Sequence, residues 1–305
     1  MARFVQFTEY GGPEGYHVID VSKPEPGVGE IRVRVLATGL NPVDHKITAY
    51  PQIGEAYGLH LPSGNGNDFA GVVDAVGAGV TWSTGDLVYG GKRFYAQADY
   101  LITTADKVIA VPDGLSVEQA GALDIVGRTA VASVRAVDPK PGETVLVSAA
   151  AGGVGVLAAQ LAVDAGARVI GTASESNHEY LRGLRIEPVA YGEGLLERVR
   201  ELVPEGVDAV LDNQGRATLE LAVALGVSKE RVNTIADRPF ATEHGFSGIG
   251  GADATIDDLA ELGKRIAAGE LDFPIDSVYP LERVVEAYQH LIAGHLRGKV
   301  VLVTE

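Results

Sequence analysis

The residues that most clearly indicate a chemical role form a cluster of small side chains, AAGGVG, at positions 150–155. Ala150, Gly152 and Gly155 have the spacing of the dinucleotide-binding fingerprint, with alanine in the first position. Gly152 would let the backbone approach a pyrophosphate, and Gly155 would let a helix lie close to the preceding strand. Any tight strand-to-helix turn favours glycine, however, so the cluster taken alone leaves a purely structural role open.

The segments around this cluster support a nucleotide site. An apolar, β-branched run ends near Ser148 and an apolar helix follows from about Val154, so the cluster lies at a strand-to-helix turn. The N–H groups of Gly153 and Val154 at the helix start would face the phosphates, helped by the helix dipole. A second strand then ends at Ser174, about 20 residues beyond the last glycine, where a ribose-binding residue belongs.

The residues after this second strand favour NADP over NAD. An NAD site would have an acidic side chain at the position of Ser174 to bind the ribose 2′-hydroxyl. Ser174, with Asn177, His178 and Arg182, would instead accommodate or bind a 2′-phosphate. Two alternatives stay open. Glu175 would serve NAD if its side chain turned inward. Independently of that, Arg182 would be an ordinary solvated helix residue.

The elements that must position these residues fall into three parts. From about 4 to 113, short β-rich runs alternate with Gly and Pro turns, which predicts an antiparallel barrel-like or sandwich domain. A helix is expected from Ser116, and from Glu143 strands and helices alternate, which is typical of a doubly wound parallel sheet. Two helices follow, and the final run KVVLV at 299–303 is expected to return to one of the two sheets.

Composition and charge limit the class of protein. With 305 residues, 46% of them apolar, the chain is long enough for two domains with buried cores. The formal net charge of −16 argues against nucleic acid or anionic membranes as partners. Because no apolar run is long enough to span a membrane and the N-terminus lacks a signal-peptide core, we expect a cytoplasmic protein. The absence of cysteine excludes disulfides, thiolate nucleophiles and cysteine-ligated metal sites.

Three further segments, together with AAGGVG, carry a resemblance to a known family. They are GLNPVDHKI at 39–47, GNDFAGVVDAVGAGVTWSTGDLVYG at 66–90 and LIAGHLRGKVVL at 291–302. The second segment, which opens on Gly-x-Asp and closes on Gly-Asp-x-Val, is the most specific of them. Over nearly its whole length the chain resembles the zinc-independent quinone oxidoreductases related to zeta-crystallin, which belong to the medium-chain dehydrogenases/reductases.

The resemblance implies an α/β fold in which a Rossmann doubly wound parallel sheet is joined to a GroES-like β-rich catalytic domain. The catalytic domain would comprise residues 1–120 and 273–305, and the Rossmann dinucleotide-binding domain residues 121–272. The cofactor would lie in the cleft between the two domains, and the C-terminal strand would complete the catalytic domain. Proteins of this family are commonly dimers, so a homodimer is expected.

The resemblance also bears on metal binding. In the zinc-dependent relatives a cysteine, a His-Glu pair and a further ligand hold the catalytic metal. This chain has Asn41 near the first position, and Asn67 and Asp68 in place of the pair. Asp44 and His45 are adjacent in sequence, and adjacent residues rarely supply a full tetrahedral set. We therefore predict no zinc.

Without a metal, the resemblance implies hydride transfer from NADPH to a small-molecule electrophile that conjugation has already activated, a quinone or an enone. Hydrogen bonds to the developing oxyanion would assist the transfer. Asn41, beside the nicotinamide, and Tyr50, through its phenol, are the predicted catalytic residues. Their structural alternatives are a turn residue and a packed loop aromatic. Asp44 is expected to be structural, paired with Arg297 or Lys299.

Further positions match the family's cofactor site. Tyr191 would lie near the 2′-phosphate, and Thr129, Asn213, Ile235 and Lys299 near the nicotinamide half. Two departures stand out, because Arg128 replaces an apolar residue and is expected to shape the substrate pocket, and His178 stands near the place of the usual phosphate-binding lysine. The complete set of predicted cofactor-binding residues is Thr129, Ala150, Gly152, Gly153, Val154, Gly155, Ser174, His178, Arg182, Tyr191, Asn213, Ile235 and Lys299.

One glycine-rich segment, RPFATEHGFSGIGG at 238–251, leaves two possibilities open. Phe246 and its neighbours would cover the substrate side of the cleft as a mobile lid, or the segment would be a surface loop without a role.

Three functions are compatible with the sequence. The favoured one is an NADPH-dependent quinone or enone reductase. A zinc-free carbonyl or alcohol dehydrogenase, or an enoyl reductase, would use the same framework. The third is a nucleotide-binding structural or sensor protein with little turnover.

Overall fold

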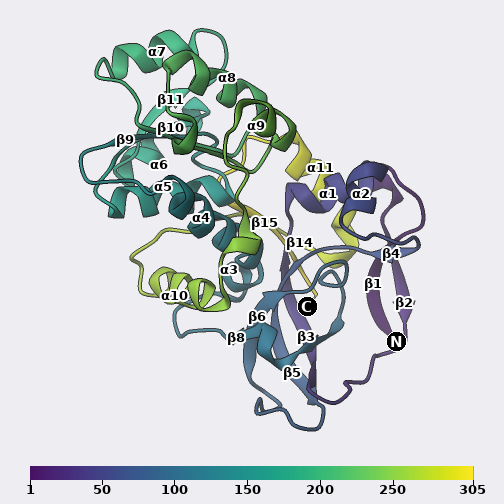
Figure 1. The fold of residues 1–305 in the computed structure, drawn as a ribbon. Helices are drawn as coiled ribbons and strands as arrows, with labels where there is room; N and C mark the ends of the chain where they lie inside the picture. The colour runs from purple at the N-terminus through teal and green to yellow at the C-terminus, as the bar shows by residue number, and fades with distance from the viewer. Residues whose placement is uncertain (305) are drawn as a thin grey trace.

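A computed structural model of the chain describes residues 1–304, which form two lobes, each built around its own main β-sheet (Figure 1). The purple N-terminal part and the yellow C-terminal strand share one lobe, and the teal and green middle of the chain forms the other. The predicted α/β organisation, with a parallel sheet and a separate β-rich domain, is confirmed. Within the described residues, no helix has the length and apolar character needed to cross a membrane.

The β-rich lobe contains a seven-stranded sheet in the order β14-β15-β3-β5-β6-β8, with β7 paired to β3, and a small sheet in the order β2-β1-β4. Strand β3 shows why the sheet forms, because Ile31, Val33 and Val35 alternate along it and all three are fully buried. The elements are β1 (Ala2–Phe7), β2 (His17–Val21), β3 (Glu30–Gly39), α1 (Pro42–Ala49), α2 (Pro51–Ala56), β4 (Ser63–Gly64), β5 (Asp68–Val76), β6 (Leu87–Gly91), β7 (Tyr100–Thr104), β8 (Val108–Ala110), β14 (Ile275–Pro280), α11 (Val284–Ala293) and β15 (Lys299–Val303). Helices α1, α2 and α11 lie together at one end of the lobe (Figure 1).

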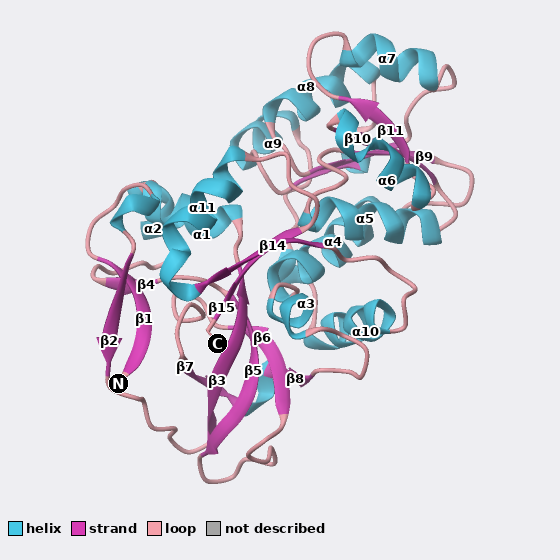
Figure 2. Cartoon of the chain, turned by 180° about the vertical axis from the view of Figure 1, so that it is seen from behind, coloured by secondary structure: helices cyan, strands magenta, loops and turns pink. Residues whose placement is uncertain are grey.

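The second lobe is the predicted doubly wound sheet, five parallel strands in the order β11-β10-β9-β12-β13. Its central strand is apolar on both sides, since Val145 and Val147 pack in one core and Leu146 in another. Figure 2 shows the helices around this sheet from behind. The elements are α4 (Asp124–Val137), β9 (Thr144–Val147), α5 (Gly153–Asp164), β10 (Arg168–Ala173), α6 (His178–Gly183), β11 (Glu187–Ala190), α7 (Leu195–Leu202), β12 (Ala209–Asp212), α8 (Arg216–Leu225), β13 (Val232–Thr234), α9 (Arg238–His244) and α10 (Ile256–Ala267). Helix α3 (Val117–Gly121), which precedes them, packs against β3 and β5 of the first lobe.

The last strand returns to the first lobe, as the sequence predicts. β15 pairs antiparallel with β3 and parallel with β14, so the end of the chain completes the N-terminal sheet. On its way it touches the other lobe, because the Gly298 N–H donates to the Ala151 carbonyl over 2.8 Å. The returning chain therefore lies against the AAGGVG turn. The domain boundaries at 120 and 273 stay a prediction.

Candidate active site

A cleft of about 2110 Å³ opens between the two lobes and is lined by residues of both. The parallel-sheet lobe contributes the AAGGVG turn and the segments that follow β10, β12 and β13. The other lobe contributes α1, the end of α2, the end of β6 and the segment before β15. Doubly wound sheets bind ligands at this place, because the carboxyl ends of their central strands converge there.

The AAGGVG turn has the geometry that a diphosphate requires. Helix α5 begins at Gly153 and has Gly152 as its N-cap, and since no side chain caps the helix, its first N–H groups stay available. At Gly155 a Cβ atom would lie 2.8 Å from the carbonyl carbon of Ala149 and closer still to its oxygen, so only glycine fits there. Of the predicted turn residues, Gly152, Gly153, Val154 and Gly155 line the cleft, whereas Ala150 is buried behind it.

The floor of the cleft is held together by the buried carboxylate of Asp212 at the end of β12. It accepts hydrogen bonds from the hydroxyls of Ser148 (3.1 Å) and Thr234 (2.5 Å), which follow or end the neighbouring strands. Asn213 donates from its amide to the Ser148 carbonyl (2.8 Å), and Ile235 donates its N–H to the Asp212 carbonyl (3.0 Å). Both Asn213 and Ile235, predicted cofactor residues, line the cleft on this rigid floor.

Where the two lobes meet, a buried polar network surrounds Lys299. Its Nζ donates to Asn41 Oδ1 (2.6 Å) and to the Leu40 carbonyl (2.6 Å), and lies 3.7 Å from Asp68 Oδ2. Asn41 Nδ2 donates to Asp68 (3.0 Å). Burial lowers the pKa of Lys299, while the carboxylate of Asp68 opposes that shift. Both ends of the Asn41 amide therefore have protein partners, so this side chain, although it lines the cleft, fixes the lysine and the carboxylate relative to each other.

Asp44 is the structural residue of this network, although its partners differ from those expected. It accepts hydrogen bonds from the Asn41 N–H (2.9 Å), from the Tyr288 hydroxyl (3.3 Å) and from Asn67 Nδ2. All three hydrogen-bond donors are neutral groups, whereas the sequence predicts that Asp44 pairs with the charged Arg297 or Lys299. Burial, with the nearby charge of Asp68, raises the pKa of Asp44 to about 6. Asp44 thereby ties the start of α1 to α11.

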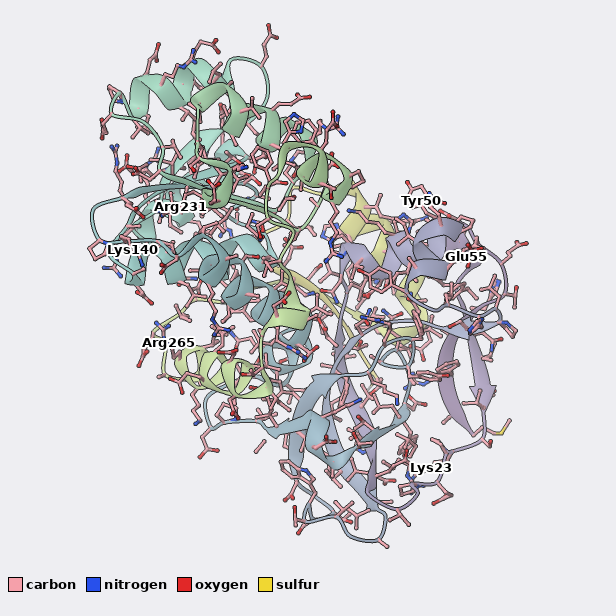
Figure 3. The ribbon with its side chains drawn as sticks, viewed as in Figure 1. Lys23, Tyr50, Glu55, Lys140, Arg231 and Arg265 are labelled. Carbon is pink, nitrogen blue, oxygen red and sulfur yellow. The ribbon has the colours of Figure 1, made fainter. Side chains whose placement is uncertain are left out.

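The predicted catalytic Tyr50 lies outside the cleft. It stands between α1 and α2, is 49% exposed, and lies at the surface near these helices (Figure 3). The tyrosine of this segment that lines the cleft is Tyr57, which follows α2. The guanidinium of Arg93 lies over its ring, 4.8 Å from the centroid. Tyr57, which the sequence analysis did not single out, is therefore the aromatic residue available to a substrate from this segment.

The segment 238–251 does not form a lid in which Phe246 covers the cleft. Part of it is the helix α9, and Phe246 packs with Phe240 against the core of the parallel-sheet lobe, their ring centroids 6.4 Å apart. His244 stacks on Phe240 with its ring centroid at 3.9 Å. The residues of this segment that line the cleft are Arg238, Pro239, Gly250 and Gly251.

The end of the cleft beyond β10 is polar and has no acidic side chain at the ribose position. Ser174 and Asn177 line it, and Asn177 Nδ2 donates to Ser174 Oγ (3.2 Å). Glu175 is exposed in the short helix η3 (Glu175–Asn177) and does not line the cleft. The predicted residues His178 and Arg182 also lie outside it, since the His178 ring faces a backbone carbonyl of β10 (3.3 Å) and Arg182 is exposed on α6.

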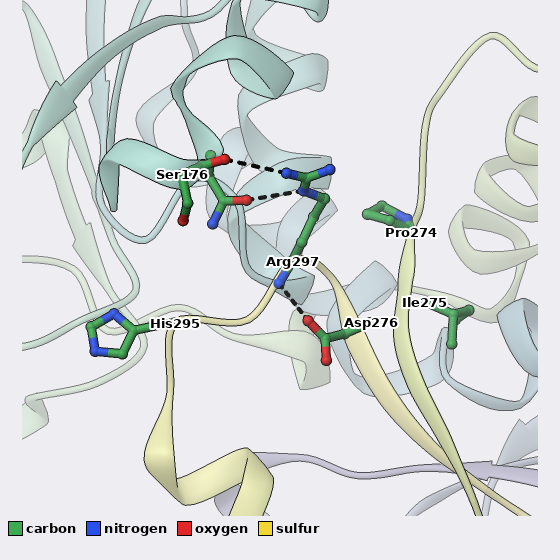
Figure 4. A pocket seen from close by; sticks show the side chains of 7 residues that line it. Ser176, Pro274, Ile275, Asp276, His295 and Arg297 are labelled. Atoms are coloured by element: carbon green, nitrogen blue, oxygen red, sulfur yellow. Dashed lines mark hydrogen bonds between the residues drawn. The ribbon is translucent and has the colours of Figure 1, made fainter.

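Two residues from distant parts of the chain complete this polar end. The hydroxyl of Tyr191, a predicted residue, lies 2.8 Å from Nδ1 of His295, which the sequence analysis did not identify. Both line the cleft. A hollow of about 400 Å³ beside them includes His295 and Arg297 in its wall (Figure 4). Arg297 is exposed, and its Nε donates to Asn177 Oδ1 (2.9 Å) while its N–H donates to Asp276 (3.0 Å). A guanidinium, an imidazole and a phenol are thus gathered within one polar surface.

The substituted zinc positions are engaged in the polar network. Asn41 and Asp68 are bound to each other and to Lys299, and Asn67 is bound to Asp44. Within residues 1–304 no group of three histidine, aspartate or glutamate side chains is arranged to hold a metal ion. Independence from zinc stays a prediction.

Comparisons with known proteins agree with this architecture. Residues 27–113 match the alcohol dehydrogenase GroES-like domain, and residues 187–302 match a domain described as zinc-binding dehydrogenase. The chain is 32% identical to a quinone oxidoreductase of Pseudomonas aeruginosa over 99% of each chain. A mycobacterial protein solved in complex with NADPH superposes with a TM-score of 0.86 at 28% identity, covering 99% of this chain and all of the other. The CurK enoyl reductase superposes with a TM-score of 0.87 at 25% identity, covering 99% of both chains.

Proposed function

Because the chain belongs to the quinone oxidoreductases of the medium-chain dehydrogenase/reductase family, we propose that it is an NADPH-dependent enzyme that reduces a quinone or another activated enone carbonyl without zinc. The observation that carries the proposal is one cleft between the lobes. Its one wall has the AAGGVG turn, which suits a diphosphate, and its other wall has the buried polar network around Lys299. The polar end beyond β10 supports NADPH over NADH. The homodimer and the cytoplasmic location stay predictions.

The cleft residues fit the proposed cofactor from end to end. The uncapped N–H groups at Gly153 and Val154 would hold the diphosphate, and Asn213 and Ile235 would support the nicotinamide half from the floor. The hydroxyl of Thr129 lines the cleft and makes no hydrogen bond within residues 1–304, so it would be free to bind the carboxamide. When bound, the nicotinamide would supply a hydride. The chain's own residues would position the acceptor and exclude water.

The preference for NADPH predicts the effect of removing the polar groups around Tyr191. In Tyr191→Phe and His295→Ala proteins we expect the affinity for NADPH to fall roughly 10-fold, about 1.4 kcal/mol, because each loses a donor to the 2′-phosphate. The affinity for NADH should be unchanged, since NADH lacks that phosphate. Fluorescence titration with both nucleotides measures the two affinities. Tyr95→Phe is the matched control, because Tyr95 is equally exposed and lies outside the cleft. Equal affinities of the wild type for both nucleotides would contradict the assignment.

The function itself is tested by following NADPH oxidation with a panel of 1,4-quinones, enones, simple ketones and alcohols. We expect turnover with the first two classes. Activity restricted to ketones or alcohols would favour the zinc-free dehydrogenase instead, and nucleotide binding without turnover would favour a structural or sensor protein. Preference for α,β-unsaturated thioesters would indicate an enoyl reductase, which the superposition on such an enzyme makes the second candidate.

A further inference from the structure

Asp124, the first residue of α4, places a carboxyl group in the wall of the cleft. It is only 9% exposed, yet it accepts no hydrogen bond within residues 1–304. Its nearest cation is Arg128, one turn along the same helix, whose Nη1 lies 3.9 Å from Oδ1. At Gly91 a Cβ atom would lie 2.9 Å from the carboxyl carbon of Asp124 and closer to one of its oxygens, so the glycine makes room for this acid. The carboxyl group is therefore enclosed but, among the described residues, not hydrogen-bonded.

The groups facing Asp124 decide which of the neighbouring acids carries a charge. From β5, Asp68 faces it, and Asp68 receives the Ile125 N–H (3.0 Å), the Asn41 amide (3.0 Å) and the nearby Lys299 ammonium (3.7 Å). Asp124 has the Arg128 guanidinium at a similar distance (3.9 Å) but, among the described residues, no hydrogen-bond donor. Burial raises the pKa of both carboxyls, and two neighbouring buried carboxyls do not both ionise readily, so the donors around Asp68 favour the negative charge on Asp68 and the proton on Asp124.

The other elements around Asp124 bring few charges. The Tyr89 hydroxyl of β6 donates to the Leu259 carbonyl (3.2 Å), and burial raises its pKa, so it stays neutral. Lys92 follows β6 along the cleft wall, and Asp253 of the short helix η5 (Gly251–Asp253) lies in the same cleft and is exposed. The direct electrostatic neighbours of Asp124 are thus Asp68 and Arg128.

We propose that Asp124 is the catalytic proton donor of the reduction, with Arg128 as the residue that stabilises the carboxylate left behind. The proposal rests on the proposed reductase function, which requires one proton for each hydride. For an enone, a bound reduced nicotinamide would supply a hydride to the β-carbon and would itself become oxidised, while the π electrons of the acceptor would move to its carbonyl oxygen. The Asp124 O–H bond then breaks and its proton goes to the enolate, which gives the saturated ketone. The Asp124 carboxylate takes up a new proton from water.

The surroundings suit this role. Burial and the charge of Asp68 raise the pKa of Asp124 to about 7, close to the pH at which a general acid is most effective. Arg128 is fixed in place, because its Nη2 donates to the Ala254 carbonyl (2.7 Å), and its buried Nε has no protein partner. The guanidinium thus has donor capacity left for a newly formed carboxylate.

Kinetics of Asp124→Asn test the proposal. We expect kcat to fall roughly 100-fold, the usual scale of a lost general acid, with NADPH affinity unchanged. The wild-type kcat should decline as pH rises through about 7, because the acid loses its proton, and this decline should be missing in the variant. Asp257→Asn is the matched control, since Asp257 is exposed in the first turn of α10 and lies outside the cleft. It should retain both the rate and the pH profile of the wild type.

A second variant and a readout without turnover keep the proposal falsifiable. In Arg128→Met the decline of kcat should move to higher pH, because the cation that favours the carboxylate is gone. In the nucleotide-free protein, an infrared difference between wild type and Asp124→Asn should show a protonated carboxyl band at pH 5.5 that disappears at pH 8.5. Absence of that band, or a variant with the wild-type rate and pH profile, would overturn the role of Asp124. A wild type that reduces none of the acceptors would instead overturn the proposed function.

Discussion

A Gly155→Ala protein is expected to lose nucleotide binding and part of its stability together. The new methyl group would lie against the backbone of Ala149 and Ala150, and backbone atoms cannot rotate out of the way. Helix α5 would have to move away from the turn. Adding a methyl group to a well-packed site typically lowers the free energy of unfolding by about 1–3 kcal/mol or more. Because the same shift withdraws the helix N–H groups from the diphosphate, we expect NADPH affinity to drop at least ~100-fold, about 2.7 kcal/mol. Urea unfolding and fluorescence titration measure the two effects.

Two other glycines separate packing from ligand contact. At Gly152 the nearest atom to an added Cβ is the Ala149 carbonyl oxygen at 3.3 Å, so Gly152→Ala should fold with nearly wild-type stability and still bind NADPH less tightly. Gly183, at the end of α6, has no atom within 4 Å of such a Cβ and lies outside the cleft. Gly183→Ala should change neither property. Wild-type NADPH affinity in Gly155→Ala would mean that the turn is not where the diphosphate binds.

The parts of the site that sequence predicts are those whose geometry is local. The AAGGVG turn, Ser174 and Asn213 all follow directly on strands of one sheet, and parallel strands bring their carboxyl ends to one edge. The alternation of strands and helices along the sequence is therefore enough to predict that these residues lie close together. The return of β15 to a sheet could also be predicted from the sequence, because an apolar strand without a neighbouring partner must pair with some sheet.

The parts that sequence misses depend on packing between distant segments. Whether Tyr50 or Tyr57 enters the cleft depends on how α2 packs against α1, and α1 against α11, which the spacing along the chain does not reveal. His295 reaches Tyr191 across 104 residues, through a backbone in the left-handed region with φ of 61°. Asp124 resembles an ordinary acidic residue at a helix start, and only the approach of Gly91 and Asp68 makes it a buried acid. Contacts of this kind, between residues far apart in the sequence, leave no local sequence pattern from which they could be predicted.

The largest effect on stability is expected from Lys299→Met, which keeps much of the side-chain volume and removes the charge. In the wild type Lys299 is 3% exposed and its ammonium lies beside the buried carboxylate of Asp68, while the Asn41 amide hydrogen-bonds to both. Removing one partner of such a buried pair leaves an uncompensated charge, at about 3–5 kcal/mol. The stem of Lys299 also packs near Gly153, so nucleotide affinity should fall as well.

The pH dependence distinguishes the lost charge from lost packing in Lys299→Met. Burial already raises the pKa of Asp68 above its unfolded value, and loss of the lysine raises it further. A raised carboxyl pKa contributes stability at low pH that is lost as pH rises through the folded value. The deficit relative to wild type should therefore be larger at pH 8 than at pH 5 in urea unfolding. Lys264→Met, at an exposed position of α10, should show no deficit at either pH. An equal deficit at both pH values would mean that Lys299 contributes through its aliphatic stem, and that its charge does not compensate the carboxylate of Asp68.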